Sequence, residues 1–207
     1  MAQYFQVHPE NPQKRLIHQA VEIIQAGGVV VLPTDSSYAI ACHIGDKRAL
    51  DKIRQIRQLS EKHDFTLICH DLTQVSHFTK IDNDAYRLIK SLTPGAFTFI
   101  LDATKEVPRR LQHPKKKTIG IRIPDNTVAQ MIVEELGEPL CSASLILPNK
   151  TDAETDPYDI RDRLENEVDL IIDFGIIDPE ETTVISCVDS EIEIVRQGIG
   201  IAPMLDN

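Results

Sequence analysis

Residues 27–42, GGVVVLPTDSSYAIAC, are the stretch of sequence that decides the fold. A glycine pair, where the backbone is freest, leads into the apolar residues 29–32, which predict a strand buried on both faces. Pro33 ends this strand, and five side chains with hydrogen-bonding groups follow at residues 34–38. Ligands of open α/β sheets bind at the carboxyl ends of strands. The stretch therefore predicts either a ligand site or a polar turn that caps the next element.

Apolar and polar residues alternate with helical or strand periodicity along the rest of the chain. The pattern predicts helices over residues 12–26, 46–59, 82–92, 126–136 and 157–164, with the fourth capped near Asp125 and closed by Gly137. Further strands are predicted over residues 65–69, 96–101, 118–123, 140–144, 168–173, 183–187 and 192–195. Strands that alternate with helices form an α/β sheet, and the three strands at the end predict mixed pairing. We expect one domain over residues 1–207, with a core at about residues 12–200.

Composition predicts a cytoplasmic protein. Hydrophobic residues make up 42% of the chain, yet no apolar run is long enough to span a bilayer, and the amino terminus lacks a signal-like segment. The four cysteines are widely spaced, which is typical of reduced core thiols. His63, His70 and His77 recur every seven residues but straddle a predicted strand and loop, so we expect no metal site.

Charge is divided unevenly along the chain, whose net charge is −10. Residues 1–125 carry 18 lysines and arginines against 13 acids, whereas residues 126–207 carry 4 against 19. The basic residues gather in two groups. One contains Lys47, Arg48, Lys52, Arg54, Arg57 and Lys62, and the other contains Arg109, Arg110, Lys115, Lys116, Lys117 and Arg122. Each group is either a surface that attracts phosphates or a solvated charged face.

Three later segments carry further signals: residues 93–101, TPGAFTFIL, residues 119–124, IGIRIP, and residues 139–144, PLCSAS. Arg122 stands inside an apolar strand, where a charge is costly to bury unless it is paired with an anion. With the opening stretch, these segments resemble the threonylcarbamoyl-adenylate synthase superfamily. Its motifs are G-G-x-x-x-x-P-T-(D/E)-(T/S)-x-Y-(G/A), T-P-G-x-x-T-x-(I/V)-L, V-x-(V/I)-R-x-P and P-L-x-S-x-S. The sequences of residues 56–59, IRQL, and 105–110, KEVPRR, are most similar to the YciO branch of this superfamily.

The resemblance implies a YrdC-type fold, a twisted open mixed sheet flanked by helices with a concave basic face. It also implies a reaction in which threonine and bicarbonate form a carbamate that attacks the α-phosphate of ATP. The product, threonylcarbamoyl-AMP, serves tRNA modification. ATP with Mg²⁺ would be a substrate, and no permanently bound cofactor is implied. The resemblance assigns substrate binding to Thr34, Tyr38 and Arg122, and nucleotide binding to Arg57, Ser142, Ser144, Thr183 and Arg196. It gives no residue a catalytic role.

Two departures from the family pattern predict reduced synthase activity. The K-x-R motif of the synthases aligns with Gln55-Ile56-Arg57, and their S-x-S-A-N motif ends here in Ile146. Loss of a cation and an amide at a phosphoryl-transfer centre lowers the rate by roughly a hundredfold or more.

We therefore expect a weak or altered synthase that also binds double-stranded RNA or tRNA by its shape and phosphates. The predicted RNA-binding residues are Arg109, Arg110, Lys115, Lys116 and Lys117. The alternative is a non-catalytic RNA-binding or ribosome-associated translation factor with a vestigial nucleotide pocket. Neither function predicts a membrane partner.

Overall fold

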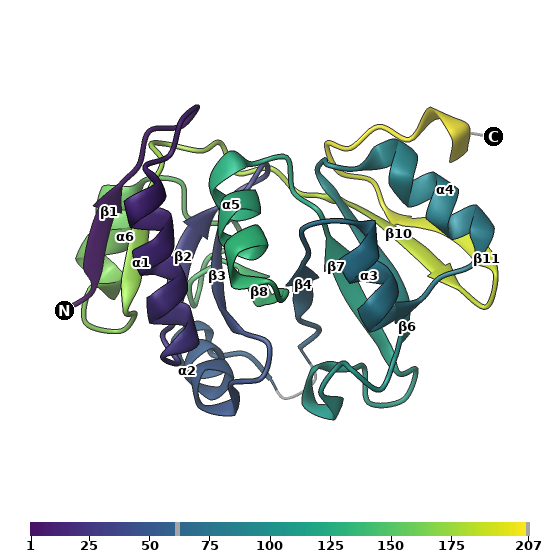
Figure 1. The fold of residues 1–207 in the computed structure, drawn as a ribbon, viewed down its shortest axis with the longest axis horizontal. Helices are drawn as coiled ribbons and strands as arrows, with labels where there is room; N and C mark the ends of the chain where they lie inside the picture. The colour runs from purple at the N-terminus through teal and green to yellow at the C-terminus, as the bar shows by residue number, and fades with distance from the viewer. Residues whose placement is uncertain (61–62, 206–207) are drawn as a thin grey trace.

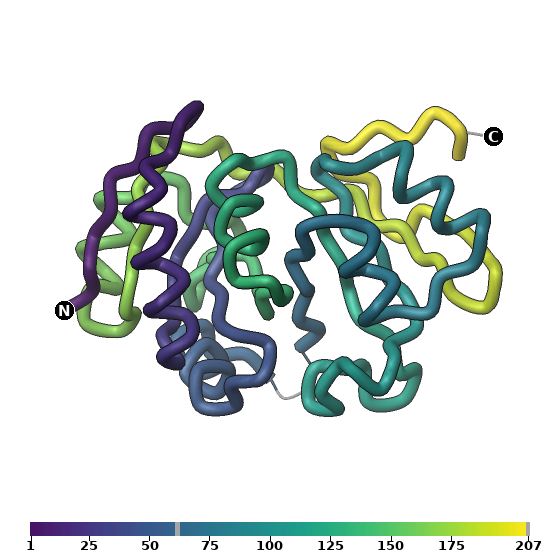
Figure 2. The backbone as a smooth tube through the Cα atoms, in the orientation of Figure 1, coloured from purple at the N-terminus to yellow at the C-terminus, as the bar shows by residue number. Residues whose placement is uncertain are grey.

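One open sheet extends through the computed structural model, which describes residues 1–60 and 63–205 (Figure 1). The strands are β1 (Gln3–Gln6), β2 (Val30–Pro33), β3 (Tyr38–His43), β4 (Thr66–Ile68), β5 (Thr79–Lys80), β6 (Phe97–Ala103), β7 (Thr118–Arg122), β8 (Leu140–Ser144), β9 (Leu170–Asp173), β10 (Thr183–Val188) and β11 (Glu191–Arg196). Their order in the sheet is β1-β9-β2-β3-β8-β4-β7-β6-β10-β11, with β5 beside β6. The edge strands β1 and β11 lie at opposite ends of the molecule (Figure 2). Lys62, which the sequence places in a basic group, lies outside the described residues.

The pairing is mixed, as the sequence predicts. Parallel neighbours are β1 with β9, β9 with β2, β4 with β7, and β6 with β10, and the remaining neighbours are antiparallel. All four residues of β2 are buried. Val30 and Leu32 pack in one hydrophobic cluster and Val29 and Val31 in the other, so this strand is covered on both faces as predicted.

Helices flank the sheet, and the described residues form six of them. They are α1 (Lys14–Gln25), α2 (Lys47–Arg57), α3 (Leu72–Phe78), α4 (Asn83–Leu92), α5 (Thr127–Leu136) and α6 (Pro157–Leu164). Figure 1 shows α1 and α5 over one half of the sheet and α3 and α4 over the other. Asp46 and Asp82 cap α2 and α4 at the predicted starts, because each side chain accepts a hydrogen bond from a first-turn N–H. The cap of α5 is Asn126, one residue after the predicted Asp125.

Several short elements were not predicted: β1, β3, α3 and β5. The strand β3 follows β2 after a tight turn, in which the Thr34 N–H and hydroxyl both donate to the carbonyl of Ser37, at 3.0 and 2.7 Å. The polar residues therefore do form a turn that starts the next element, an antiparallel hairpin partner of β2. The four cysteines are buried. Within the described part of the chain, no helix is both long and apolar enough to cross a membrane.

Candidate functional site

A cleft of about 500 Å³ opens on the sheet face turned away from α3 and α4. Strand alternation creates this polar face, because Phe97, Phe99 and Leu101 of β6 point into the hydrophobic core and leave Thr98 and Ile100 to line the cleft. The same alternation along β7 buries its isoleucines and turns Thr118, Gly120 and Arg122 toward the cleft. The arrangement gives a concave surface rich in hydroxyl and cationic groups.

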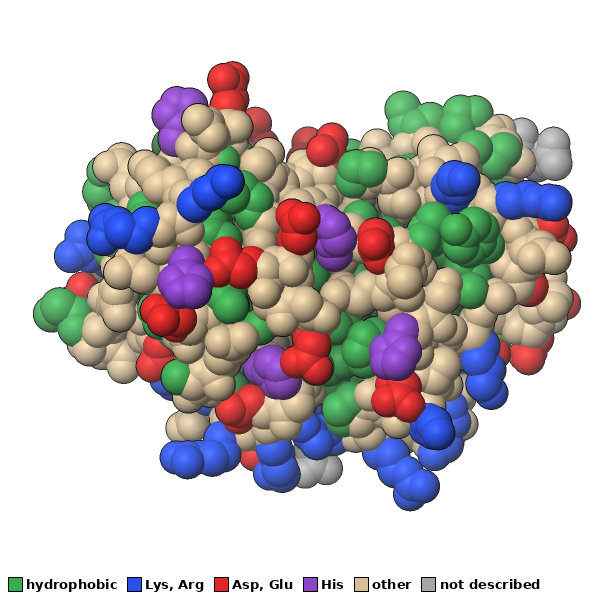
Figure 3. All heavy atoms as spheres, viewed as in Figure 1, with side chains coloured by type: hydrophobic (Ala, Val, Ile, Leu, Met, Phe, Trp, Pro, Cys, Tyr) green, Lys and Arg blue, Asp and Glu red, His purple; other side chains and the backbone are tan. Residues whose placement is uncertain are grey.

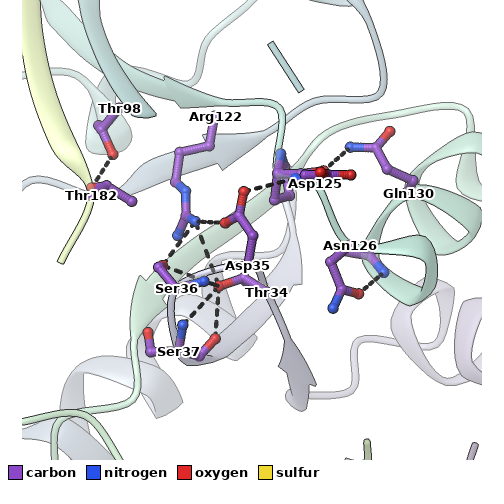
Figure 4. A network of polar contacts seen from close by, with 12 residues as sticks. Thr34, Asp35, Ser36, Ser37, Thr98, Arg122, Asp125, Asn126, Gln130 and Thr182 are labelled. Carbon is purple, nitrogen blue, oxygen red and sulfur yellow. Dashed lines mark hydrogen bonds and ion pairs between the residues drawn. The ribbon is translucent and has the colours of Figure 1, made fainter. Parts of the chain in front are cut away.

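Arg122 ends β7 and is held by the turn that follows β2 (Figure 4). Its Nη2 lies 2.6 Å from Oδ1 of Asp35 and 3.0 Å from Oγ of Ser36. The second carboxylate oxygen of Asp35 accepts a hydrogen bond from the N–H of Asp125 at 2.8 Å. Burial lowers the pKa of Arg122, and the charge and hydrogen bond of Asp35 oppose that change. The anion that the sequence requires for this buried arginine is therefore present in the same chain.

The guanidinium of Arg122 is only partly satisfied. Nη2 makes every hydrogen bond described for this side chain, including a 3.5 Å contact with Oγ1 of Thr34. Nε is buried and has no hydrogen-bond partner among the described residues. A buried unpartnered donor is unfavourable. Nη1 also makes none of the hydrogen bonds described for this residue, and it is not among the buried atoms, so it is the nitrogen left for a ligand in the cleft.

A second polar group lies across the cleft. The hydroxyls of Thr98 and Thr182 are 2.8 Å apart (Figure 4). Arg196 donates from Nη2 to the carbonyl of Thr182 at 2.9 Å, and its Nη1 lies 3.4 Å from Glu181. A smaller recess of about 100 Å³ shares Ser144, Thr182 and Arg196 with the cleft. The cleft thus carries guanidinium groups on two sides.

Four of the predicted ligand-binding residues line the cleft: Arg122, Ser142, Ser144 and Arg196. Thr34 contacts Arg122 through its hydroxyl, which also donates to the carbonyl of Ser37.

Thr34 and three further predicted residues, Tyr38, Thr183 and Arg57, lie outside the lining of the cleft. The Tyr38 hydroxyl donates to the carbonyl of Gly175 at 2.7 Å, and Thr183 donates to the carbonyl of Gly200 at 2.6 Å. Arg57 donates from Nε to the carbonyl of Ile146 at 2.8 Å, just beyond the end of β8.

Sequence reasoning did not single out Thr98, Thr182, His113 or Lys116 as residues of the cleft, nor Asp35 as the partner of Arg122. Asp35 lies in the stretch 27–42 and Thr98 in the segment 93–101, so these two motifs could have indicated both residues as candidates. Thr182 immediately precedes Thr183, and the alternation of side chains decides which of the two faces the cleft. His113 and Lys116 come from the segment between β6 and β7, whose path no local pattern specifies.

The residues that depart from the family pattern lie apart from one another. Gln55 is exposed on α2 and lines a separate groove with Ile56 and Leu147. Ile146 lines the small recess beside the cleft and offers its carbonyl to Arg57.

The predicted RNA-binding residues are all exposed. Arg110 donates from Nη2 to the carbonyl of Gly45 at 2.7 Å, which joins the segment before β7 to the start of α2. Lysine and arginine side chains gather along this lower edge of the molecule in Figure 3. In the described structure none of the five lies within 4.0 Å of a carboxylate, unlike Lys47, which pairs with Asp51. Lys116 also lines the cleft, so basic surface and cleft are continuous.

The open mixed sheet, with its polar cleft on one face, defines an α/β protein of the YrdC type, as the family resemblance implies. The chain belongs to the Sua5/YciO/YrdC family, because the model of that family, described as "Telomere recombination", matches residues 22–198. Among the described residues, no three His, Cys, Asp or Glu side chains gather as a metal-binding group.

Sequence and structure comparisons with individual proteins support this family assignment. The chain is 53% identical to the Escherichia coli protein YciO over 206 residues, covering 99% of this chain and 100% of YciO. The YciO crystal structure matches with a TM-score of 0.94. A threonylcarbamoyl-AMP synthase of Coxiella burnetii is 32% identical over 131 residues, or 62% of this chain and 69% of the synthase. The P. abyssi Sua5 structure complexed with L-threonine shares the fold, with a TM-score of 0.86 at 22% identity over 94% of this chain and 57% of Sua5.

Proposed function

We propose that this protein binds a nucleotide and an amino acid in the cleft and acts as a weak or altered threonylcarbamoyl-AMP synthase. The amino group of threonine and bicarbonate would form a carbamate with loss of water. A carbamate oxygen would then attack the α-phosphorus of ATP, and the bond from this phosphorus to the bridging oxygen would break to release pyrophosphate. The relationship to the Coxiella burnetii synthase supports this reaction.

The incomplete pairing of Arg122 carries the proposal. Its side chain is 8% exposed and lines a cleft large enough for a small ligand, yet its Nη1, which is not buried, makes no hydrogen bond in the described structure. A carboxylate is the acceptor that best matches the geometry of a guanidinium. The carboxylate of threonine, the ligand in the Sua5 complex, is therefore the group we place beside Arg122.

Arg196 and Lys116 line the cleft, and we expect these cations to face a polyphosphate. Mg²⁺ would arrive with ATP as part of the substrate and spread the negative charge of the phosphates. We expect slow turnover because Gln55 lies on an exposed face away from the cleft, and Ile146 presents an alkyl chain where the synthases have an amide.

The direct test is pyrophosphate release from ATP in the presence of threonine and bicarbonate, measured beside the Coxiella burnetii synthase. We expect threonine-dependent release at well under about a tenth of the synthase rate. Arg122→Lys should reduce release further by roughly tenfold, because the ammonium cannot reproduce the planar pair of N–H donors. Release that does not depend on threonine, or an unaffected Arg122→Lys variant, would exclude this reaction for the cleft.

Basic residues that form no ion pair within the described residues support a second part of the proposal, binding of double-stranded RNA or tRNA. Arg109, Arg110 and Lys115, Lys116 and Lys117 form an exposed surface, here called the basic edge, beside the cleft. Unpaired cations attract phosphates more strongly than cations held in ion pairs. Should the assay show no synthase activity, RNA binding alone would favour the alternative, a non-catalytic RNA-binding or ribosome-associated factor. The salt dependence of binding to a short RNA duplex tests this part.

A further inference from the structure

His113 lies between β6 and β7 and lines the cleft. Its backbone is held in a turn, because its N–H donates to the carbonyl of Thr118 at 2.8 Å and its carbonyl accepts from the N–H of Lys117 at 2.9 Å. The residue is half-buried. The turn that leads into β7 therefore holds at the cleft a histidine that the reaction proposed above does not use.

The hydrogen bonds of the His113 ring determine which nitrogen carries the proton. Nδ1 accepts the N–H groups of Lys115 and Lys116 at 3.3 and 3.1 Å. A neutral imidazole has one donor and one acceptor nitrogen, so the proton of the neutral ring is on Nε2. Nε2 makes no hydrogen bond with the described residues, and it is not among the buried atoms that lack a partner. His113 therefore offers one accessible N–H donor at the cleft.

A structural role explains only part of this side chain. The bonds to Nδ1 stabilise the turn, as a side-chain oxygen of Asn or Asp does in many turns. His8 makes a bond of the same kind, because its Nδ1 accepts the N–H of Asn11 at 3.1 Å, and it is exposed outside the cleft. Such a bond does not require the second ring nitrogen. The Nε2 donor is the part of His113 that the turn leaves unexplained.

His113 and Arg196 lie at opposite ends of the cleft. Through β10, the strand register places Arg196 level with Thr98 of β6. Thr118, to which His113 is bonded, is level with Asp102 of β6. Four residues along a strand span about 13 Å. A ligand with its anionic groups beside Arg196 would therefore place a different part of its structure beside His113.

The part of the cleft nearer to His113 has a low floor with apolar neighbours. Leu111 and Ile100 line the cleft, and Gly120 is level with Ile100 in the register. Gly120 has no side chain, and a Cβ at this position would lie 3.0 Å from Oγ1 of Thr66. A glycine within a strand allows a ligand to approach the backbone closely. A planar ring can therefore lie against this part of the sheet.

The charges of the cleft leave a neutral role for His113. Arg122 follows Thr118 by four residues on β7, so it lies at the end where Arg196 is, and guanidinium groups suit anions. Lys116 shares the turn with His113, but it is exposed and its ammonium has a long flexible stem, so it can meet a phosphate at the rim. A single neutral N–H among apolar side chains instead fixes the orientation of an aromatic ligand.

We propose that His113 recognises the base of the nucleotide by donating a hydrogen bond from Nε2 to a ring nitrogen of a base that lies over Gly120. This inference rests on the proposed function for the nature of the ligand, and it adds a residue that determines specificity. Adenine is the base to test, because its ring nitrogens N1, N3 and N7 are all acceptors.

The test uses calorimetric titration of the full chain with AMP and, separately, with ribose 5-phosphate. His113→Phe keeps a planar ring and removes the donor, so it should weaken AMP binding by roughly tenfold and leave ribose 5-phosphate unchanged. His113→Gln, whose amide can still donate, should bind AMP with intermediate affinity. His8→Phe is the matched control and should bind AMP like the wild type. Thermal unfolding should show that each variant is folded.

Analogues of AMP test the same hydrogen bond without a change in the protein. Of 1-deaza-AMP, 3-deaza-AMP and 7-deaza-AMP, one should bind the wild type roughly tenfold more weakly than AMP, because it lacks the acceptor. The affinity of that analogue should not change in His113→Phe. If all three analogues remain as sensitive to His113→Phe as AMP is, no ring nitrogen accepts from His113 and the inference is wrong.

The outcomes separate this inference from the proposed function. Equal weakening of AMP and ribose 5-phosphate by His113→Phe would show an effect on the phosphate or the fold, and base recognition would be wrong. If threonine-dependent pyrophosphate release occurs but AMP affinity is indifferent to His113, only the inference fails. If AMP binding depends on His113 and no release occurs, the base site stands and the synthase proposal fails. A wild type that does not bind AMP would overturn both.

Discussion

Arg122 shows how far single residues of this site can be predicted. An arginine inside an apolar strand requires an anion, and the sequence establishes that requirement without identifying the partner. Asp35 is that partner although 87 residues separate them. β8 and β4 lie between β3 and β7 in the sheet, so the contact joins a turn and a strand that are not neighbours. The tertiary structure, and no local pattern, reveals this contact.

The Arg122–Asp35 pair gives a prediction about stability. Both side chains are nearly buried, with exposed fractions of 8% and 10%. Arg122→Leu should reduce the free energy of unfolding by about 3–5 kcal/mol, because Asp35 is left as an uncompensated buried charge. The double variant with Asp35→Asn should lose less than the sum of the two single losses. Urea unfolding measures these changes.

An exposed pair provides the control for this experiment. Lys47 and Asp51 are neighbours on the surface of α2, with exposed fractions of 71% and 54%. Lys47→Leu should change the free energy of unfolding by no more than about 0.5 kcal/mol. Additive losses for Arg122 and Asp35 would contradict the view that they form one coupled unit.

Thr182 and Thr183 are a case in which a motif does not predict which side chain faces the cleft. The family resemblance identifies a pair of hydroxyl residues but not the direction in which each points. Thr183 is paired with Phe97 across β10 and β6, and it is fully buried, whereas Thr182 faces the cleft beside Thr98. The register of two strands decides this, and that register depends on contacts distant in sequence.

At the scale of elements, helices with local signals were predicted well. Asp46 and Asp82 are caps that precede helical apolar spacing, and Gly137 closes α5 in the left-handed conformation that glycine favours. The missed helix α3 begins at Leu72 and has seven residues. Its cap, Asp71, lies between His70 and His77, which the sequence analysis considered only as metal ligands. The strand β3 was missed because its nearly uninterrupted burial gives no alternation to detect.

The contact between α1 and α5 gives a prediction about pH. Nδ1 of His18 on α1 lies 2.5 Å from Oε1 of Glu135 on α5. The hydrogen bond that His18 donates to Glu135, with the charges of Glu135 and Glu22, raises the pKa of His18 above its ordinary value of 6.5. A raised pKa in the folded state stabilises the protein fully below the unfolded value, and this contribution is lost as pH rises through the folded value.

We therefore expect His18→Gln to destabilise the protein at pH 6 and to have little effect at pH 9. Urea unfolding of wild type and variant at both pH values measures the difference. Glu135→Gln should show the same dependence on pH in this window, and the double variant should add nothing further. A loss from His18→Gln that is larger at pH 9 would show that packing, and not the charge of His18, determines the contact.

At the scale of the whole molecule, the sequence shows that positive and negative charge divide between two parts of the chain. It does not show where the fold puts these charges on the surface. Residues 1–125 carry the positive excess, and the fold gathers part of it along the basic edge. The hydrogen bond from Arg110 to Gly45 brings this edge to the start of α2, whose Lys47 and Arg48 are also exposed. Because Lys116 belongs to both the basic edge and the cleft, an RNA bound there would lie next to the small-ligand site.

The last prediction concerns this edge. A short RNA duplex should bind with a Kd of about 1–100 μM at low salt, and the affinity should fall linearly with salt on logarithmic axes, because phosphate contacts release counterions. The triple variant Arg109→Glu, Lys115→Glu and Lys117→Glu should weaken binding and reduce the salt slope by about 3. It spares Lys116, so the affinity for AMP should not change.

A matched triple variant, Lys14→Glu, Arg15→Glu and Arg87→Glu, makes the same total charge change at exposed positions on α1 and α4, away from the basic edge. Fluorescence anisotropy with a labelled duplex, repeated across a salt series, compares the two proteins. If net charge alone governed binding, both triple variants would lose the same affinity. If the basic edge makes the phosphate contacts, the matched variant should keep most of the wild-type affinity and its full salt slope. Binding that persists at high salt, or an equal loss in both variants, would remove the basic edge as the RNA-binding surface.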